Sequence, residues 1–261
     1  MMSKRLVSLA AALLLSSAGE APASPRPLPF SYPYETLPAG KLEVEQYVDL
    51  VPLRVPEEQP DGTMEGVTSF RSELQTELEF GVTDRLEAGW YLVFAEDAGS
   101  GTAMSFRGIK QRLRYRLGEA GEWPVNVGLY LEAAEFRDEL ELEEKLLLSR
   151  RFGALNVVAN LVLEQEYVWS QDDVKLIYAP TFGVSYELMP QLMFGAEYWS
   201  KGSVGDDAVS RHYVGPTALV QSGEVFVSLG VYLRVDNLGD DIATGDAFGR
   251  VWVRALIGIG L

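Results

Sequence analysis

The side chains that most often perform nucleophilic or acid–base catalysis are scarce in this chain. Its 261 residues contain one histidine, His212, and no cysteine. In Ser210-Arg-His-Tyr a serine could act as nucleophile with His212 as general base, the chemistry of a lipid hydrolase on the outer wall of a membrane barrel. The alternation of the surrounding segment turns His212 inward, however, and no turn or polar neighbour distinguishes a nearby serine. We therefore expect no catalytic residues and no enzyme activity.

Acidic side chains are abundant but form no recognisable catalytic pair or metal site. Hydrolysis by carboxylates alone needs two acids at a defined separation with pKa values driven apart, and no pair stands out. Asp236-Asn-Leu-Gly-Asp240-Asp241 is only superficially similar to a calcium loop, because its spacing lacks the alternating ligands of an EF-hand. We expect no metal and no cofactor.

Two long segments each carry a row of charged side chains on one face. In residues 67–82 the odd-numbered positions include Arg71, Glu73 and Glu77, and the even-numbered positions are mostly apolar. In residues 104–117 four basic side chains occupy even-numbered positions, namely Lys110, Arg112, Arg114 and Arg116. A charge facing lipid near the bilayer midplane costs about 2–4 kcal/mol. The rows therefore predict an enclosed polar interior and an apolar exterior.

Folding neighbouring segments about their turns brings opposite charges together along the interior. Lys110 is expected opposite Glu132 and Arg116 opposite Asn126. Arg112 is expected near Glu87, whose other neighbour is Glu79. Lys145 is expected diagonally near Glu164, which Lys175 can approach from the other side. These pairs form either a network that rigidifies the interior or a path that selects a small polar or ionic solute, and one network can do both.

Trp199 is the aromatic residue that we expect beside such a path, since it shares the inner face of its segment with Glu197. Other aromatic residues on the outer faces are expected to anchor the two membrane interfaces. The expected residues of the interior path are Lys110, Arg112, Arg114, Arg116, Glu132, Lys145, Glu164, Lys175, Glu197 and Trp199.

Period-2 alternation must position these side chains, and it predicts an all-β fold. The connections are alternately short and long, except that the one around Arg137-Asp138-Glu139 is short where a long one is expected. This alternation is typical of a single up-and-down antiparallel transmembrane β-barrel with short periplasmic turns and longer extracellular loops. A dry core could not fill a soluble barrel of this size, and a soluble two-sheet sandwich would not explain the longest segments. The twelve expected strands are 41–51, 67–82, 85–94, 104–117, 125–136, 140–152, 155–167, 174–188, 191–200, 211–221, 224–235 and 249–261.

The two ends of the chain fit export to an outer membrane. Residues 1–23 combine a short positive region, a ten-residue apolar core from Leu6 to Leu15 and the small-x-small sequence Ala21-Pro22-Ala23, which predicts a cleaved signal peptide. Residues 24–40 are expected to be a periplasmic leader, too short for a folded plug domain. Residues 41–261 are expected to form the barrel, whose last alternating strand must close it.

The net charge excludes one class of partner. Without the two basic residues and one acidic residue of the expected signal peptide, 20 basic and 37 acidic residues remain, a net charge of −17. Nucleic acid is not the partner of such a surface. Since there is no cysteine, no disulfide framework supports the fold.

Several short motifs carry a resemblance to a known group of proteins. Thr36-Leu-Pro38-x-Gly40 and Gly81-x-Thr-Asp-Arg-Leu86 are the most specific; Leu129-Tyr-Leu-Glu132, Gly195-Ala-Glu-Tyr-Trp199 and Tyr213-Val-Gly-Pro-Thr217 are shorter. The chain resembles an uncharacterised family of bacterial outer-membrane barrels, which is similar to the transporter-like barrels associated with the meta-pathway of phenol degradation. The resemblance implies a fold, an outer-membrane location and solute passage.

The sequence thus favours a passive pore or small-solute transporter with a charged lumen. A non-conducting structural or surface-interaction barrel is the alternative, and a lipid-modifying enzyme that depends on His212 is a third. The expected partners are outer-membrane lipid, lipopolysaccharide and a small polar or ionic solute. The acidic long connections are expected to form a solvated surface.

Overall fold

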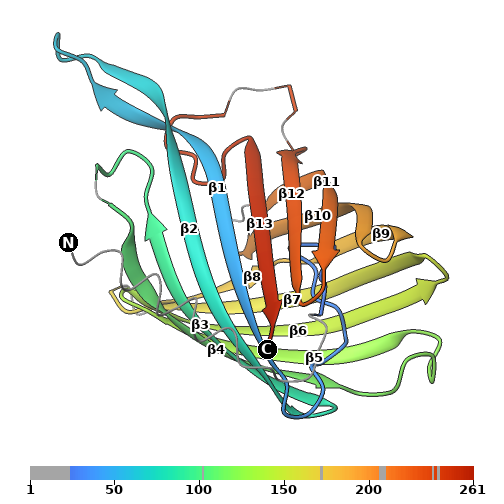
Figure 1. Ribbon diagram of the computed structural model, residues 1–261. Helices are drawn as coiled ribbons and strands as arrows, with labels where there is room; N and C mark the ends of the chain where they lie inside the picture. Colours follow the sequence, from blue (N-terminus) through green and yellow to red (C-terminus); the bar gives the residue numbers. More distant parts are fainter. Residues whose placement is uncertain (1–23, 102, 171–172, 206–209, 237, 240–241) are drawn as a thin grey trace, which may run out of the picture.

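The chain folds into one antiparallel β-sheet that closes on itself as a barrel (Figure 1). The computed structural model describes residues 24–261 apart from 102, 171–172, 206–209, 237 and 240–241, so the expected signal peptide lies outside the described residues. Within the described residues no helix is long and apolar enough to cross a membrane.

The sheet contains thirteen strands within the described residues. They are β1 Leu42–Glu58, β2 Met64–Thr83, β3 Leu86–Glu96, β4 Ser105–Arg116, β5 Asn126–Phe136, β6 Glu139–Phe152, β7 Leu155–Val168, β8 Asp173–Tyr178, β9 Thr181–Met189, β10 Leu192–Val204, β11 Ser210–Ser222, β12 Val225–Arg234 and β13 Val251–Gly260.

The last strand closes the barrel, as predicted. β13 pairs with β12 on one side and with β1 on the other, where Val44 lies opposite Ile259 and Leu50 opposite Val253. Closure satisfies the backbone of strands that would otherwise be edges, which is the condition for a sheet to cross lipid.

β8 and β9 are two halves of one membrane-crossing segment, which the sequence predicts as residues 174–188. Both halves pair with β7 and β10, and the register is the same on the two sides of the gap between them, with Tyr178 opposite Leu163 and Thr181 opposite Asn160. Pro180 lies between them and has no N–H to donate to the ladder. The thirteen strands therefore make a barrel of twelve crossings, and the predicted fold is confirmed.

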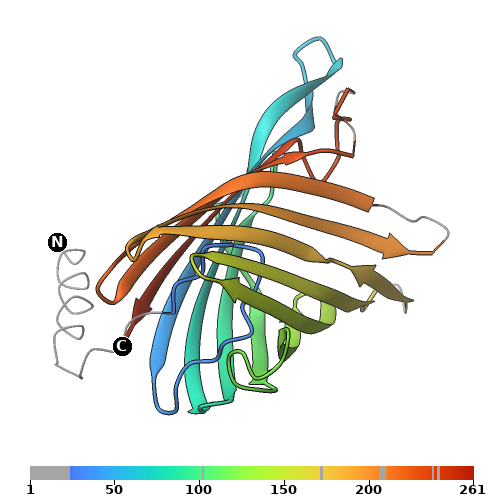
Figure 2. The ribbon, with the colours of Figure 1, turned by 90° about the vertical axis from the view of Figure 1, so that its right-hand side faces the viewer.

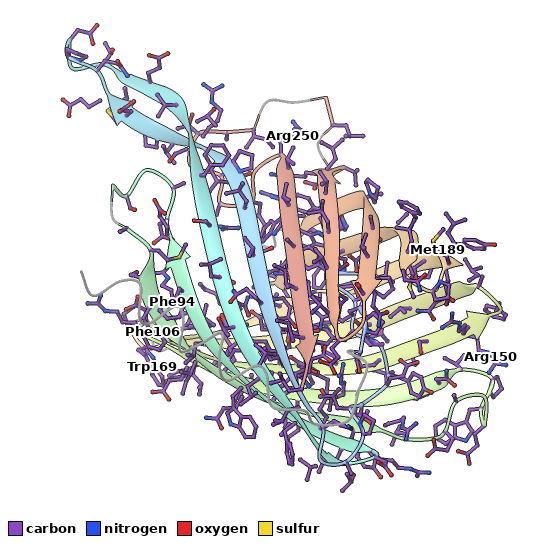
Figure 3. The ribbon with its side chains drawn as sticks, in the orientation of Figure 1. Phe94, Phe106, Arg150, Trp169, Met189 and Arg250 are labelled. Atoms are coloured by element: carbon purple, nitrogen blue, oxygen red, sulfur yellow. The ribbon has the colours of Figure 1, made fainter. Side chains whose placement is uncertain are left out.

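The strands are apolar on the outside and polar or aromatic on the inside. β12 shows the pattern most clearly, since its side chains alternate between exposed and buried over its whole length. Val227, Leu229 and Val231 are exposed, whereas Phe226 and Tyr232 are fully buried. Phe94 and Phe106 lie side by side on the outer wall, with ring centroids 5.5 Å apart (Figure 3). This arrangement suits a barrel surrounded by lipid.

The first long connection is more ordered than the sequence predicts. Residues 52–66 were expected to be a loop, but β1 and β2 continue through them as a two-stranded ribbon that projects beyond the barrel (Figure 1). Val51, Leu53 and Val55 extend the alternation, and the ribbon turns at Gln59, whose N–H donates to the carbonyl of Thr63. The prolines at positions 52 and 56 do not interrupt the pairing.

Residues 24–38 lie inside the barrel. They were expected to belong to a periplasmic leader outside it. Figures 1 and 2 show this dark blue segment between the walls before the chain turns into β1. Leu28 and Tyr34 are 1% exposed and Leu37 is 3% exposed. A segment of this length with buried apolar side chains and no alternation gains its stability from the wall that it contacts. We call residues 24–38 the lumen segment.

Candidate functional site: a charged vestibule above the lumen segment

A cavity of about 500 Å³ occupies the barrel between the long connections and the lumen segment. Its lining includes Asp97 in the long β3–β4 connection and Asp138 in the short β5–β6 turn at one end. Phe30 and Tyr32 of the lumen segment contribute to its other end. Acidic, basic and aromatic side chains share the wall. We call this cavity the vestibule. It can hold a small solute that presents both charged and apolar groups.

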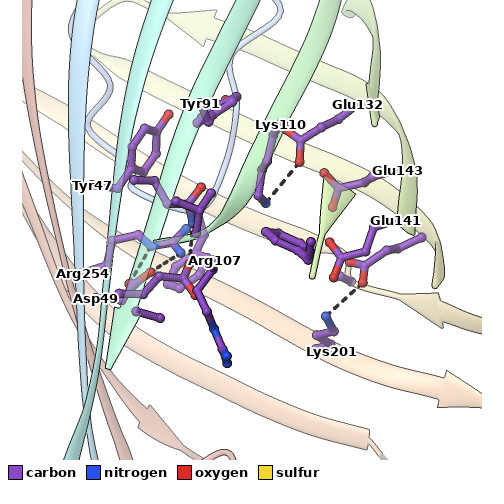
Figure 4. Close-up of a pocket in the computed structure, with 18 of the residues that line it drawn as sticks. Tyr47, Asp49, Tyr91, Arg107, Lys110, Glu132, Glu141, Glu143, Lys201 and Arg254 are labelled. Atoms are coloured by element: carbon purple, nitrogen blue, oxygen red, sulfur yellow. Dashed lines mark hydrogen bonds and ion pairs between the residues drawn. The ribbon is translucent and has the colours of Figure 1, made fainter. Parts of the chain in front are cut away.

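Two charged regions face each other across the vestibule (Figure 4). On one side Arg254 forms an ion pair with Asp49, with 2.5 Å between Nη2 and Oδ2. On the other side lie Lys110, Glu132, Glu141, Glu143 and Lys201. Each region combines both signs of charge, so neither sign dominates the wall of the vestibule.

Lys110 and Glu132 form the ion pair that the sequence predicts, although the strands align differently. Lys110 lies opposite Ala134 and Arg112 lies opposite Glu132, a shift of two residues from the predicted register. Because a shift of two keeps every side chain on the same face, Lys110 still reaches Glu132 diagonally, with 3.2 Å between Nζ and Oε1. Both side chains line the vestibule.

Arg112 and Arg114 lie within the wall below the vestibule, in a buried ion-pair network. Arg112 contacts Glu77 at 2.5 Å and Glu87 at 2.6 Å, and it also pairs with Glu79. Arg114 contacts Glu87 at 2.7 Å. These guanidinium groups are at most 4% exposed, so they rigidify the barrel and do not line the vestibule.

Arg116 lies at the short-turn end, where its guanidinium donates to the carbonyl of Asp84 and pairs with Glu119 at 2.9 Å. Its neighbour across the strands is Gly128 and not the expected Asn126. The same shift of two residues explains the difference.

Glu164 receives a different partner from those expected. Lys145 pairs with Glu143 at 2.9 Å, and Lys175 is exposed near the end of β8. Lys201 instead contacts Glu164 at 3.0 Å and Glu166 at 3.4 Å. Lys201 was not predicted, because residues 201–210 were expected to form a loop. Extending the alternation of Glu197 and Trp199 by two residues would have found it.

Glu197 and Trp199 hold the lumen segment. The carboxylate of Glu197 accepts hydrogen bonds from the backbone N–H of Phe30 and Ser31, the latter at 2.7 Å, and from the hydroxyl of Tyr232. Trp199 stacks on Phe30 and on the wall residue Tyr213, with centroids 4.5 and 4.3 Å apart. At Glu197 and Trp199 the predicted interior path is therefore occupied by the lumen segment.

The lumen segment continues past Glu197 to the opposite wall. Asn160 accepts a hydrogen bond from the N–H of Tyr32 at 2.7 Å and donates one to the Tyr32 carbonyl at 2.9 Å. Below the segment a second cavity of about 280 Å³, lined partly by Ser24, Arg26 and Glu35, reaches the short turns. The lumen segment therefore separates two cavities within one barrel.

His212 lies on the outer wall, and the expected inward orientation is wrong. Tyr213 and Arg211 point inward, where Tyr213 stacks on Trp199, so the alternation of β11 turns His212 and Ser210 outward. The Ser210 hydroxyl lies 2.8 Å from His212 Nε2, and the Tyr198 hydroxyl lies 2.7 Å from Nδ1. An open cleft beside the last long connection is lined by Ser210 and His212 among others.

Asp236 and Asp246 brace this cleft. Burial raises the pKa of each carboxyl, but hydrogen bonds outweigh burial, and both pKa values are lower than usual. Asp236 accepts from the His212 N–H, and both carboxylates accept from Arg234. Both groups are therefore ionised at neutral pH, and the last connection is tied to the rim.

The comparisons with known proteins agree with this architecture. No protein-family model and no curated protein matches the chain. Among solved structures it is similar to an outer-membrane channel from Pseudomonas putida F1, with 11% identity, 87% of this chain and 98% of that chain covered, and a TM-score of 0.58. It is also similar to the NanC porin, with 9% identity, coverage of 84% and 98%, and a TM-score of 0.55. The translocator domain of the autotransporter NalP from Neisseria meningitidis gives 12% identity, coverage of 85% and 89%, and a TM-score of 0.50.

These identities are low, so the similarity concerns the fold. The fold is that of an outer-membrane β-barrel, which the apolar outer wall and the charged interior also define.

Proposed function

We propose that the protein is an outer-membrane channel for a small polar or ionic solute, which enters at the vestibule. The vestibule supports this proposal most directly, because it is a cavity of about 500 Å³ with a charged lining inside a closed barrel. A purely structural barrel gains nothing from a cavity of this size, since voids weaken packing. The signal peptide at residues 1–23 and the relation to barrels of phenol degradation belong to the same proposal.

Passage requires the lumen segment to move or to leave a narrow path beside it. Its hydrogen bonds to Glu197 and Asn160 are few, so local release costs less free energy than unfolding of the barrel. The proposed channel is therefore gated, and the structure with the lumen segment in place is its closed form.

Planar-bilayer conductance tests the channel. We expect the full chain to conduct rarely or in small steps, and a variant that joins Ser24 to Leu37 by deletion of residues 25–36 to conduct in large, frequent steps. A matched control replaces residues 57–65 of the projecting ribbon with Asn-Gly, which forms a tight hairpin turn outside the lumen. If the deletion variant forms a heat-modifiable barrel and remains silent, the protein is a scaffold and not a channel.

A second candidate function rests on one observation, the contact of Ser210, His212 and Tyr198 on the lipid-facing wall. Ser210 lies level with Tyr178, across Gly202, in the outer aromatic band where lipid ester bonds lie. With Nδ1 protonated towards Tyr198, His212 Nε2 could take the Ser210 proton as the oxygen attacks an ester carbonyl. The proton then passes to the leaving alcohol, and water hydrolyses the acyl-enzyme.

Release of fatty acid from phospholipid or lipopolysaccharide vesicles tests this second candidate. We expect Ser210→Ala and His212→Asn each to abolish release, and the outward-facing control Ser72→Ala to leave it unchanged. Absence of release by the folded wild-type barrel would eliminate the candidate without affecting the channel proposal.

A further inference from the structure

The first described residue approaches a buried carboxylate. The backbone nitrogen of Ser24 lies 2.8 Å from Oε2 of Glu43, whose side chain is 1% exposed. The second oxygen, Oε1, is buried and has no hydrogen-bond partner among the described residues. A buried carboxylate that receives one amide donor is poorly compensated, because each lost water contact costs free energy.

Glu43 also belongs to a surplus of negative charge in the wall around the lumen segment. Five buried carboxylates in this region face three guanidinium groups. The carboxylates belong to Glu43, Glu45, Glu77, Glu79 and Glu87, and the guanidinium groups to Arg26, Arg112 and Arg114. Oxygens of Glu45, Glu77 and Glu79 lie within 4.8 Å of one another. One more cation at this position would reduce the surplus.

The sequence can supply that cation. Ala21-Pro22-Ala23 precedes Ser24 and is a small-x-small cleavage sequence. Cleavage after Ala23 would convert the Ser24 amide into an α-ammonium group, which carries a positive charge and three N–H donors at neutral pH.

We propose that removal of the signal peptide creates an ion pair between the Ser24 ammonium group and Glu43, and that this pair locks the lumen segment inside the barrel. The ammonium group has two more N–H donors than the amide, and Oε1 of Glu43 is an acceptor without a hydrogen-bond partner among the described residues. Export and gating are thereby coupled, since the precursor has one neutral donor at this position and the processed chain has a charged group. The proposal rests on cleavage before Ser24 and does not depend on what the channel carries.

Neighbouring contacts make Glu43 an effective attachment point. Two residues further along, Arg26 pairs with Glu45 at 3.5 Å, and its guanidinium carbon lies 4.2 Å from the ring centroid of Tyr32. Glu43 and Glu45 share the inner face of β1. The N-terminal end of the lumen segment is therefore held at two adjacent points, of which the first depends on processing.

The test compares two chains that differ by one residue at their N-terminus. Both are refolded in detergent from cytoplasmic material, one beginning at Ser24 and the other at Ala23. The extra alanine restores the Ser24 amide and moves the ammonium group by about 3.5 Å. Because the chain has no native cysteine, Leu28→Cys reports release of the lumen segment through its rate of reaction with a water-soluble maleimide.

We expect the Ala23 chain to react about ten times faster than the Ser24 chain, and Glu43→Gln to remove that difference. The ribbon variant Glu57→Gln should leave it intact. Ser31→Cys serves as reporter if Leu28→Cys does not refold. Equal rates for the two folded chains would overturn the lock, as would an exported protein whose measured mass shows a different first residue. A silent channel with unequal rates would contradict the channel alone.

Discussion

Glu197 shows how one inward-facing side chain can determine the state of the lumen. Its carboxylate binds the backbone of Phe30 and Ser31, which lie more than 160 residues away in the sequence, and its position next to Trp199 aligns this contact with a stacked aromatic pair. A backbone amide inside a barrel needs an acceptor. Glu197 supplies that acceptor for the amides of Phe30 and Ser31.

Replacing this carboxylate with an amide should release the lumen segment. In Glu197→Gln one oxygen becomes a donor and the charge is lost, so at least one charge-assisted hydrogen bond, worth about 1.5–3 kcal/mol, disappears. We expect maleimide labelling of Leu28→Cys to accelerate about 10- to 100-fold. Glu135→Gln on the outer face is the matched control. An unchanged labelling rate in a folded Glu197→Gln barrel would show that Glu197 does not hold the segment.

Individual lumen residues could be predicted where alternation alone decides their orientation. Lys110 and Glu132 meet as expected because an error of two positions preserves the face. The partners of Glu197 could not be predicted, since the lumen segment has no periodicity and lies far away in the sequence. The orientation of His212 was predicted wrongly, because an error of one position in the alternation of its strand turns an outward side chain inward.

At the scale of elements, the two most specific sequence motifs meet at one corner of the barrel. Thr36-Leu-Pro38-x-Gly40 leaves the lumen there, and the turn that follows Gly81 lies against it. The Thr36 hydroxyl donates to the Asp84 carbonyl, the Ala39 N–H to the Asp84 carboxylate, and the Gly40 N–H to the Gly81 carbonyl at 2.7 Å. Gly40 has a φ of 79°, a conformation that glycine adopts without strain. The motifs are thus two halves of one contact.

A side chain at Gly81 should disrupt this corner. A Cβ there would lie 2.0 Å from the carbonyl oxygen of Pro38, and backbone atoms cannot move aside as a flexible side chain can. We expect Gly81→Ala to lower the free energy of unfolding by about 1–3 kcal/mol, measured as a shift in the urea midpoint by tryptophan fluorescence. Gly239→Ala, where nothing lies within 4 Å, is the control. Equal midpoints for the two variants would contradict the contact.

The strands themselves were largely predictable because each must alternate over a bilayer thickness. The prediction was wrong where alternation continues past the bilayer, as in the β1–β2 ribbon. It also treated as uninterrupted a segment in which Pro180 removes one donor without changing the register. The lumen segment could not be predicted from alternation, because a segment that packs inside a barrel needs no alternating pattern.

At the scale of the whole molecule, one closed wall serves three environments. Its outer face meets lipid, its upper interior forms the vestibule, and its lower interior binds the lumen segment. Only a barrel wider than a side-chain-filled one can hold these parts together. Such a barrel is too wide to be filled by a dry apolar core. The ion-pair network around Arg112 stabilises its wall instead.

Because every environment depends on closure, loss of the final strand should abolish all of them together. In a chain truncated after Gly249, β1 and β12 lose their shared partner β13, and two unpaired edges in lipid each leave a row of unsatisfied backbone groups. We expect no compact, heat-modifiable band on unboiled gels and rapid proteolysis, whereas the variant with Asn-Gly in place of residues 57–65 keeps the band. If the truncated chain still migrates compactly and resists protease, β1 and β12 can pair directly, and the size of the vestibule is set by the remaining strands and not by closure through β13.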